Sequence, residues 1–161
     1  MSRVKTIARA DLVALSAQAA ASSRRRQNLN LHPALDDPVQ RLLNAFEPGT
    51  CIRPHRHTGK WELFARLTGR VALLTFDDAG VVQARAELDA GTPIAEIPAD
   101  TWHTLVALES GTVLLEVKPG PYAPLAPVGF APWAPPEGSN AAVTLEAWCR
   151  TAQAGERCPS L

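Results

Sequence analysis

Three histidines and one glutamate are the side chains best suited to act together in this chain of 161 residues. His55 and His57 are separated by one residue, so on a strand both would point to one face while Arg56 would point to the other. Glu62 would come from the next strand, and His103 from a neighbouring strand further along the chain. Two imidazoles and a carboxylate suit Fe(II), Mn(II), Ni(II) or Zn(II), and a third imidazole completes the set. We therefore predict one divalent transition-metal ion held by these four side chains.

Two basic residues beside these ligands are candidates for binding a substrate. Arg53 has the same strand parity as the paired histidines, so it would face the cavity and bind a carboxylate or phosphate through a bidentate contact. The alternative is that Pro54 bends the start of the strand and turns Arg53 to solvent. Lys60, in the loop between the ligands, would either reach the mouth of the cavity or remain a solvated lysine.

Other candidates have both a functional and a structural interpretation. Phe64 continues the inward parity of the glutamate, as a substrate platform or as core filling in a small barrel. Tyr122 follows a Pro-Gly-Pro turn and is either a lid residue or an anchor that packs a proline-rich loop. His32, on an extended segment, is predicted to be structural, with a proton carrier as the alternative. The basic triplet at residues 24–26 is predicted to be solvated or to face a partner rather than to clamp a phosphate, since no glycine-rich phosphate loop accompanies it.

Short strands are the elements expected to position these side chains. From Leu42 to Lys118, β-rich runs alternate with turn residues, which predicts an antiparallel sandwich or barrel. The runs are expected at residues 61–67, 70–76, 81–88, 102–108 and 112–117, with hairpins closed by residues 77–80 and 109–111. Seven prolines between Pro119 and Gly138 exclude a central strand and predict a loop wrapped on the barrel.

Helices are predicted near both ends of the chain. Residues 11–22 carry apolar residues at helical spacing, with Asp11 placed to cap the helix. A last helix is expected at residues 140–150, capped by Ser139 or Asn140. We divide the single domain into a helix and arm at 1–37, a barrel at 38–120, and a proline-rich loop with the last helix at 121–161.

The composition limits the compartments and partners that we expect. Lys plus Arg equals Asp plus Glu at 16 each, so the net charge gives no reason to expect nucleic acid or an anionic membrane. Three cysteines without a CxxC pair favour a reducing compartment, and we predict a cytoplasmic protein. Arg3, Lys5 and Arg9 before a partly apolar stretch loosely mimic a secretory signal, but Asp11 and further polar residues interrupt it.

The ligand spacing resembles the conserved motifs of the cupin superfamily. The first motif is matched without a gap by this order: Gly49, five residues, His-x-His, four residues, a glutamate, six residues and Gly69. Pro98 and His103 resemble the second motif, with Asp100 in place of its turn glycine and Ala107 in place of an asparagine that is not a ligand. Asp tolerates the left-handed conformation of such a turn. The resemblance implies an all-β double-stranded β-helix, the cupin jelly-roll barrel, with a short helix at each end.

A second resemblance covers nearly the whole chain. Blocks of sequence look like the WbuC-type cupin-fold metalloproteins, which occur in bacterial O-antigen gene clusters among other places. The blocks lie at residues 24–32, 40–45, 53–57, 60–64, 76–78, 101–104 and 116–122. This resemblance implies a metal and a link to lipopolysaccharide biosynthesis, and it supplies no substrate.

Two classes of function follow from these observations. We predict a metal-binding cupin that acts on a small anionic or sugar-derived ligand at the barrel mouth, as a dioxygenase or isomerase in which the metal is a Lewis acid or oxygen activator. The alternative is a non-catalytic module that senses a carbohydrate or metabolite. Beyond the ligands no clear general acid or base is visible, and Glu116 or Tyr122 would serve only if placed near the metal. Exposed edge strands and the N-terminal arm predict a homodimer, as in many cupins.

Overall fold

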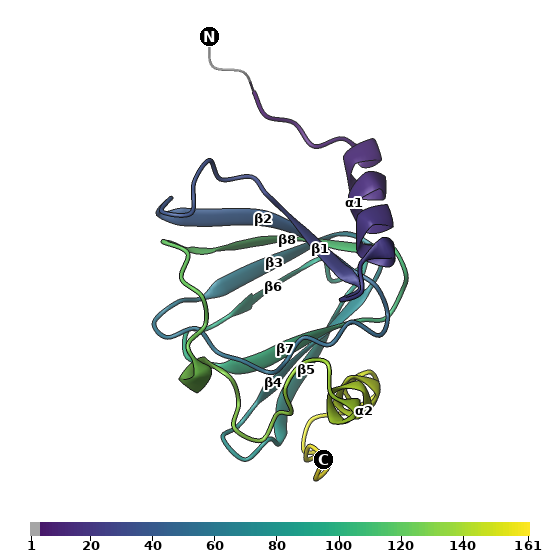
Figure 1. The fold of residues 1–161 in the computed structure, drawn as a ribbon, viewed down its shortest axis with the longest axis vertical. Helices are drawn as coiled ribbons and strands as arrows, with labels where there is room; N and C mark the ends of the chain where they lie inside the picture. Colours follow the sequence, from purple (N-terminus) through teal and green to yellow (C-terminus); the bar gives the residue numbers. More distant parts are fainter. Residues whose placement is uncertain (1–3) are drawn as a thin grey trace.

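Two antiparallel β-sheets lie face to face and form a jelly-roll barrel, with a short helix beside each sheet (Figure 1). The structure is a computed structural model that describes residues 4–161. One sheet has the strand order β1 (Arg26–Asn30), β2 (Val39–Phe46), β8 (Thr112–Pro119), β3 (Glu62–Thr68) and β6 (Ile94–Ile97). The other has the order β5 (Val82–Leu88), β4 (Val71–Phe76) and β7 (Trp102–Ala107). The helices are α1 (Arg9–Ala21) and α2 (Asn140–Cys149), with a 3-10 turn, η1, at Pro127–Gly129. This architecture confirms the predicted all-β jelly roll with a helix at each end.

The three-stranded sheet is buried on both of its faces. Leu74 and Phe76 of β4 pack outward in a cluster with residues of α2 and the proline-rich loop. Leu73 of β4 and Leu105 of β7 pack inward in a second cluster that fills one end of the barrel. Because both faces are covered, β4 and β7 are almost continuously apolar, as expected for strands with no solvated side.

The five-stranded sheet is covered on its outer face by α1. Leu15 and Ala19 of this helix pack on Leu43 of β2 and Val113 of β8. The helix begins after Ala8, and the Asp11 carboxylate accepts a hydrogen bond from the Ala8 N–H at 2.7 Å. Asp11 therefore supports the helix start from the third helical position rather than as the cap itself. At the other end of the chain the Ser139 hydroxyl accepts from the Ala142 N–H and caps α2.

Part of the predicted N-terminal arm belongs to the sheet. β1 lies within this arm and pairs with β2 from Arg26 opposite Phe46 to Asn30 opposite Leu42. Arg3, one of the basic residues of the signal-like stretch, lies outside the described residues. Within residues 4–161 neither α-helix is long and apolar enough to cross a membrane.

The predicted hairpin at residues 109–111 is wrong. β7 pairs with β4, whereas β8 pairs with β2 and β3, so this connection passes from one sheet to the other. The Glu47 carboxylate, at the end of β2, accepts hydrogen bonds from the Gly111 N–H and the Ser110 hydroxyl. A three-residue turn serves a hairpin or a corner equally well, and this contact from a distant part of the chain fixes the corner.

The predicted strand through the His-x-His pair is also wrong. His55 forms only isolated bridges, with His103 and Phe130, and the residues around it are irregular. Pro54 has no N–H for a ladder, and the Arg56 N–H donates to the Gly129 carbonyl of the proline-rich loop. The backbone of this segment is therefore held by two partners in turn instead of by one neighbouring strand.

Candidate metal centre

Two histidines are fixed against each other by their backbones. His55 N–H donates to the His103 carbonyl at 3.0 Å, His103 N–H donates back at 2.9 Å, and the ring centroids lie 4.4 Å apart. The Nδ1 atom of each ring lies 2.9 Å from a carbonyl oxygen two residues earlier, of Arg53 and Thr101 respectively. A carbonyl only accepts, so each Nδ1 carries the ring proton and each Nε2 keeps a free lone pair. This tautomer is the one that a metal-ligating histidine needs.

Glu62, the first residue of β3, completes a group of three donor atoms. One donor atom each from His55, Glu62 and His103 lies within 4.8 Å of the other two. Glu62 Oε2 is 2.8 Å from His103 Nε2, yet both atoms are buried and neither has an aligned hydrogen bond. Buried polar atoms are rarely left without a partner, and two imidazole nitrogens with a carboxylate suit a divalent transition metal. The three side chains therefore fit a bound ion.

His57 lies at the edge of this group. Its Nε2 atom is 3.3 Å from Glu62 Oε1, and its ring centroid is 5.2 Å from that of His55 and 6.2 Å from that of His103. It is outside the set of atoms within 4.8 Å of one another and lines an adjoining cavity of about 360 Å³, together with His55 and Lys118. The structure thus brings three of the four predicted ligands together, and the fourth stays a prediction.

Burial keeps these groups in the protonation states that metal binding requires. Desolvation lowers the pKa of His55 to about 3 and that of His57 to about 4. Burial alone would raise the pKa of Glu62, but the contact with His103 and the nearby charge of Lys118 outweigh it and hold the pKa below its usual range. At neutral pH the His55 and His57 imidazoles are therefore neutral and the Glu62 carboxylate is ionised. An ion would not have to displace protons from these side chains.

Lys118 is the residue of the site that the sequence reasoning missed. Its Nζ atom lies 3.1 Å from Glu62 Oε1 and 2.6 Å from Glu116 Oε1. Burial would lower the pKa of Lys118, but the two carboxylates raise it. Burial is also the main reason why the pKa of Glu116 is raised. The contacts of its carboxylate with Lys118 and with the Asn44 amide lower this pKa, but they do not outweigh burial. Lys118 therefore holds one oxygen of the Glu62 carboxylate from the side.

A cavity of about 500 Å³ adjoins the three donor atoms. Arg53 lines it, with Nε donating to the Ala134 carbonyl at 3.0 Å and the guanidinium 4.9 Å from the centre of the Phe130 ring. Phe64 is 1% exposed and belongs to the core, while part of it lines the cavity. Arg53 thus faces the cavity, and Phe64 fills the barrel beneath it.

The mouth of the cavity is formed by the proline-rich loop. Tyr122 is half exposed there, and its N–H donates to the Leu35 carbonyl. Lys60 lines the adjoining cavity with His57, and its Nζ donates to the Pro121 carbonyl at 2.7 Å. Lys60 therefore joins the ligand loop to the proline-rich loop.

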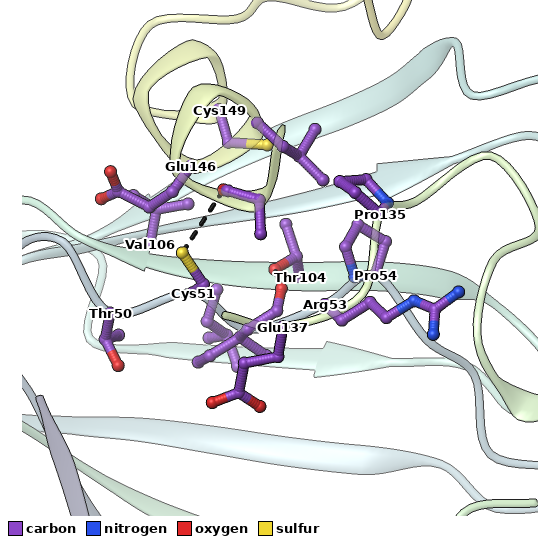
Figure 2. Close-up of a pocket in the computed structure, with 14 residues that line it drawn as sticks. Thr50, Cys51, Arg53, Pro54, Thr104, Val106, Pro135, Glu137, Glu146 and Cys149 are labelled. Carbon is purple, nitrogen blue, oxygen red and sulfur yellow. Dashed lines mark hydrogen bonds between the residues drawn. The ribbon is translucent and has the colours of Figure 1, made fainter. Parts of the chain in front are cut away.

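Ion pairs of Glu137 with two arginines form another part of the wall of the 500 Å³ cavity. The Glu137 carboxylate accepts from Arg24 at 2.9 Å and from Arg26 at 2.8 Å, and these contacts lower its pKa to about 2. Glu137 and Arg53 also border a narrow crevice under α2, where the Cys51 thiol donates to the Ala142 carbonyl (Figure 2). This crevice measures about 10 Å³ and has room for roughly one water molecule, so the ligand-sized space is the barrel cavity.

Comparisons with known proteins give one family model and several solved structures of low sequence identity. A family model described as "Domain of unknown function (DUF6016)" matches residues 7–88, and no curated protein matches the chain. A cupin superfamily protein from Desulfitobacterium hafniense is 18% identical, with 58% of this chain and 76% of that chain covered at a TM-score of 0.48. KdgF from Halomonas sp. is 17% identical, with 61% and 82% covered at 0.49. Oxalate decarboxylase from Bacillus subtilis, a protein with Mn(II) centres, is 17% identical, with 61% and 26% covered at 0.48.

Proposed function

We propose that this chain, which belongs to the DUF6016 family, is a metal-dependent cupin that acts on a small anionic or sugar-derived ligand in the barrel cavity. The observation that carries the proposal is the convergence of His55, Glu62 and His103 on one point beside a cavity of about 500 Å³. The donor set suits Fe, Mn, Ni or Zn. Bound there, such an ion would supply Lewis-acid chemistry to a ligand oxygen.

The basic residues of the cavity support an anionic ligand. Arg26 and Lys118 also line it, but both are held by carboxylates. Among the described residues the Arg53 side chain makes one hydrogen bond, from Nε, so its two terminal nitrogens are available to donate. A guanidinium with two free donors binds a carboxylate or phosphate in a defined orientation. Arg53 would orient the ligand while Lys118 keeps Glu62 in place.

The resemblance to the WbuC-type proteins leads us to place the ligand in surface polysaccharide (O-antigen) metabolism. The cytoplasm is proposed from the three cysteines without a CxxC pair, and the homodimer from the edge strands and the N-terminal arm. A dioxygenase or isomerase reaction is proposed from the metal as oxygen activator or Lewis acid. A non-catalytic sensor is the second candidate. The observation that favours it is that Lys118 and Glu116, two titratable residues next to the three donors, are already engaged with each other.

Metal analysis of the purified protein tests the first part of the proposal. We expect about one equivalent of a transition metal in the protein as isolated, and loss of that metal in the His55→Ala and His103→Ala variants. His32→Ala is the matched control, because His32 lies outside the donor group. Full metal content in the His103→Ala variant would overturn the assignment.

Oxygen uptake and binding measurements then separate the two candidates. Iron in the protein and oxygen consumption that depends on added sugars or keto acids would establish a dioxygenase. Zinc or nickel, with tight binding of a sugar or keto acid and no turnover, would establish a sensor.

A further inference from the structure

A second compartment opens beside the metal cavity. It measures about 440 Å³ and shares Asn28, Lys118 and Tyr122 with the metal cavity. Asn28 and Asn30 of β1 form part of its wall together with Gln40 of β2. Strand pairing places Asn30 opposite Leu42, and Leu42 opposite Glu116, so these side chains lie on the inner face of the sheet.

Two amide groups in this wall are arranged to bind neighbouring hydroxyls. Asn28 Nδ2 donates to Asn30 Oδ1 at 3.0 Å. This contact leaves Asn28 Oδ1 to accept a hydrogen bond and Asn30 Nδ2 to donate one. A pair of adjacent hydroxyl groups matches that arrangement, because each hydroxyl both donates and accepts.

His32 adds an unpaired polar atom to the compartment. Its Nδ1 atom lies 3.0 Å from the Arg41 backbone nitrogen and 2.9 Å from the Arg41 carbonyl oxygen, so Nδ1 is engaged with the Arg41 backbone. The His32 side chain is 6% exposed and lines the compartment, and Nε2 is buried without a partner among the described residues. A hydroxyl group both donates and accepts, so one bound in the compartment would pair with Nε2 in either tautomer of the ring.

The charge of the lining distinguishes this compartment from the metal cavity. Lys118, at the boundary, is its one lysine or arginine and it has no carboxylate, and the other polar groups are carboxamides, the His32 imidazole and the Tyr122 hydroxyl. Tyr122 is 52% exposed, so its ring is free to pack on the apolar face of a sugar. The compartment thus suits an uncharged, hydroxyl-rich group, whereas Arg53 in the adjoining cavity suits an anion.

From this juxtaposition we infer that the compartment is a subsite for the polyhydroxylated part of an acidic sugar whose anionic group lies in the metal cavity. The inference deepens the proposed function and rests on it for the anionic end. The acid is a carboxylate or a phosphate, since Arg53 binds both in the same way.

Binding of acidic sugars to the zinc-loaded protein, measured by calorimetry, tests the subsite. The probes are D-glucuronate, D-galacturonate and their hexose 1-phosphate counterparts, with glycolate and inorganic phosphate as references that lack the sugar ring. We expect at least one acidic sugar to bind about tenfold more tightly than its reference, because two or more hydrogen bonds are added. A uronate preference assigns the carboxylate, and a hexose phosphate preference assigns the phosphate.

Variants of β1 locate the effect. Asn30→Ala should remove most of the sugar's advantage and leave the affinity for the reference anion unchanged. Leu29→Ala, on the opposite face of the same strand and 40% exposed, is the matched control and should leave both affinities unchanged. Equal affinities for sugars and references, equal losses for both in Asn30→Ala, or no binding of any sugar would overturn the subsite. The proposed function fails separately, if zinc or the reference anions do not bind.

Discussion

Along β8 the barrel interior changes from apolar at one end to polar at the other. Leu114 is fully buried and packs with Phe46 and Phe64 in the apolar end. Glu116 and Lys118, two and four residues further on, lie beside the metal donors. One strand therefore provides both the packing that fixes its position and the charges that act at the site. The comparison teaches that the polar side chains need no rigid surroundings of their own, because the apolar end of the same strands holds them.

Removing packing at the apolar end gives the largest expected effect. Leu114→Ala should lower the free energy of unfolding by about 3 kcal/mol, since it leaves a cavity in a closed core. Urea unfolding followed by tryptophan fluorescence measures this change. The folded variant should retain its metal. Loss of metal without loss of stability would contradict the view that the apolar end determines stability and the polar end determines metal binding.

Acid should weaken the polar end before it affects the apolar end. The pKa of His55 is about 3 in the folded protein and near 6.5 in the unfolded chain, so the unfolded chain binds the extra proton between these values. Stability is therefore full above pH 7 and is lost as the pH falls, by about 2 kcal/mol between pH 7 and pH 5 from this residue. Unfolding of the metal-free protein at several pH values measures the slope. His55→Gln should flatten the slope, and an unchanged slope would contradict the assignment.

Neutralising the lysine of the polar end should have the smallest of the three effects, and the effect falls on metal affinity. Lys118→Met keeps the length of the side chain and removes the contact with Glu62 Oε1. We expect metal affinity to fall by about tenfold, because residues that orient a ligand affect affinity on that scale. Chelator competition measures the affinity. In the single variant the Glu116 carboxylate is left unpaired, so the double variant Glu116→Gln, Lys118→Met is the control for that effect. An unchanged metal affinity in both variants would show that Lys118 does not position Glu62.

Local sequence signals predicted the turn at Asp100 and the donor group well. Asp100 has φ of 63°, in the left-handed region that the second motif requires, and its carboxylate accepts from the Gly59 N–H at 3.2 Å. It thereby joins the loop that carries His57 to the turn before His103. These features depend on residue type and spacing alone, so the sequence is sufficient to find them.

The role of Lys118 could not be predicted from its strand. In β8, Leu115 and Val117 alternate with Glu116 and Lys118, a pattern that normally places the polar residues in solvent. Helix α1 packs on the face that holds Val113 and Leu115, which turns the polar residues into the barrel. The direction of the strand is thus decided by a helix about a hundred residues away in the sequence, and no local pattern carries that information.

The ion pairs of Glu137 with Arg24 and Arg26 have a consequence for how the cavity is enclosed. They join the segment at the start of β1 to the loop before α2, and all three residues line the cavity. The eight strands end at residue 119, whereas this wall needs residue 137. The strands alone therefore leave the binding space open on one side, and a loop outside both sheets closes it.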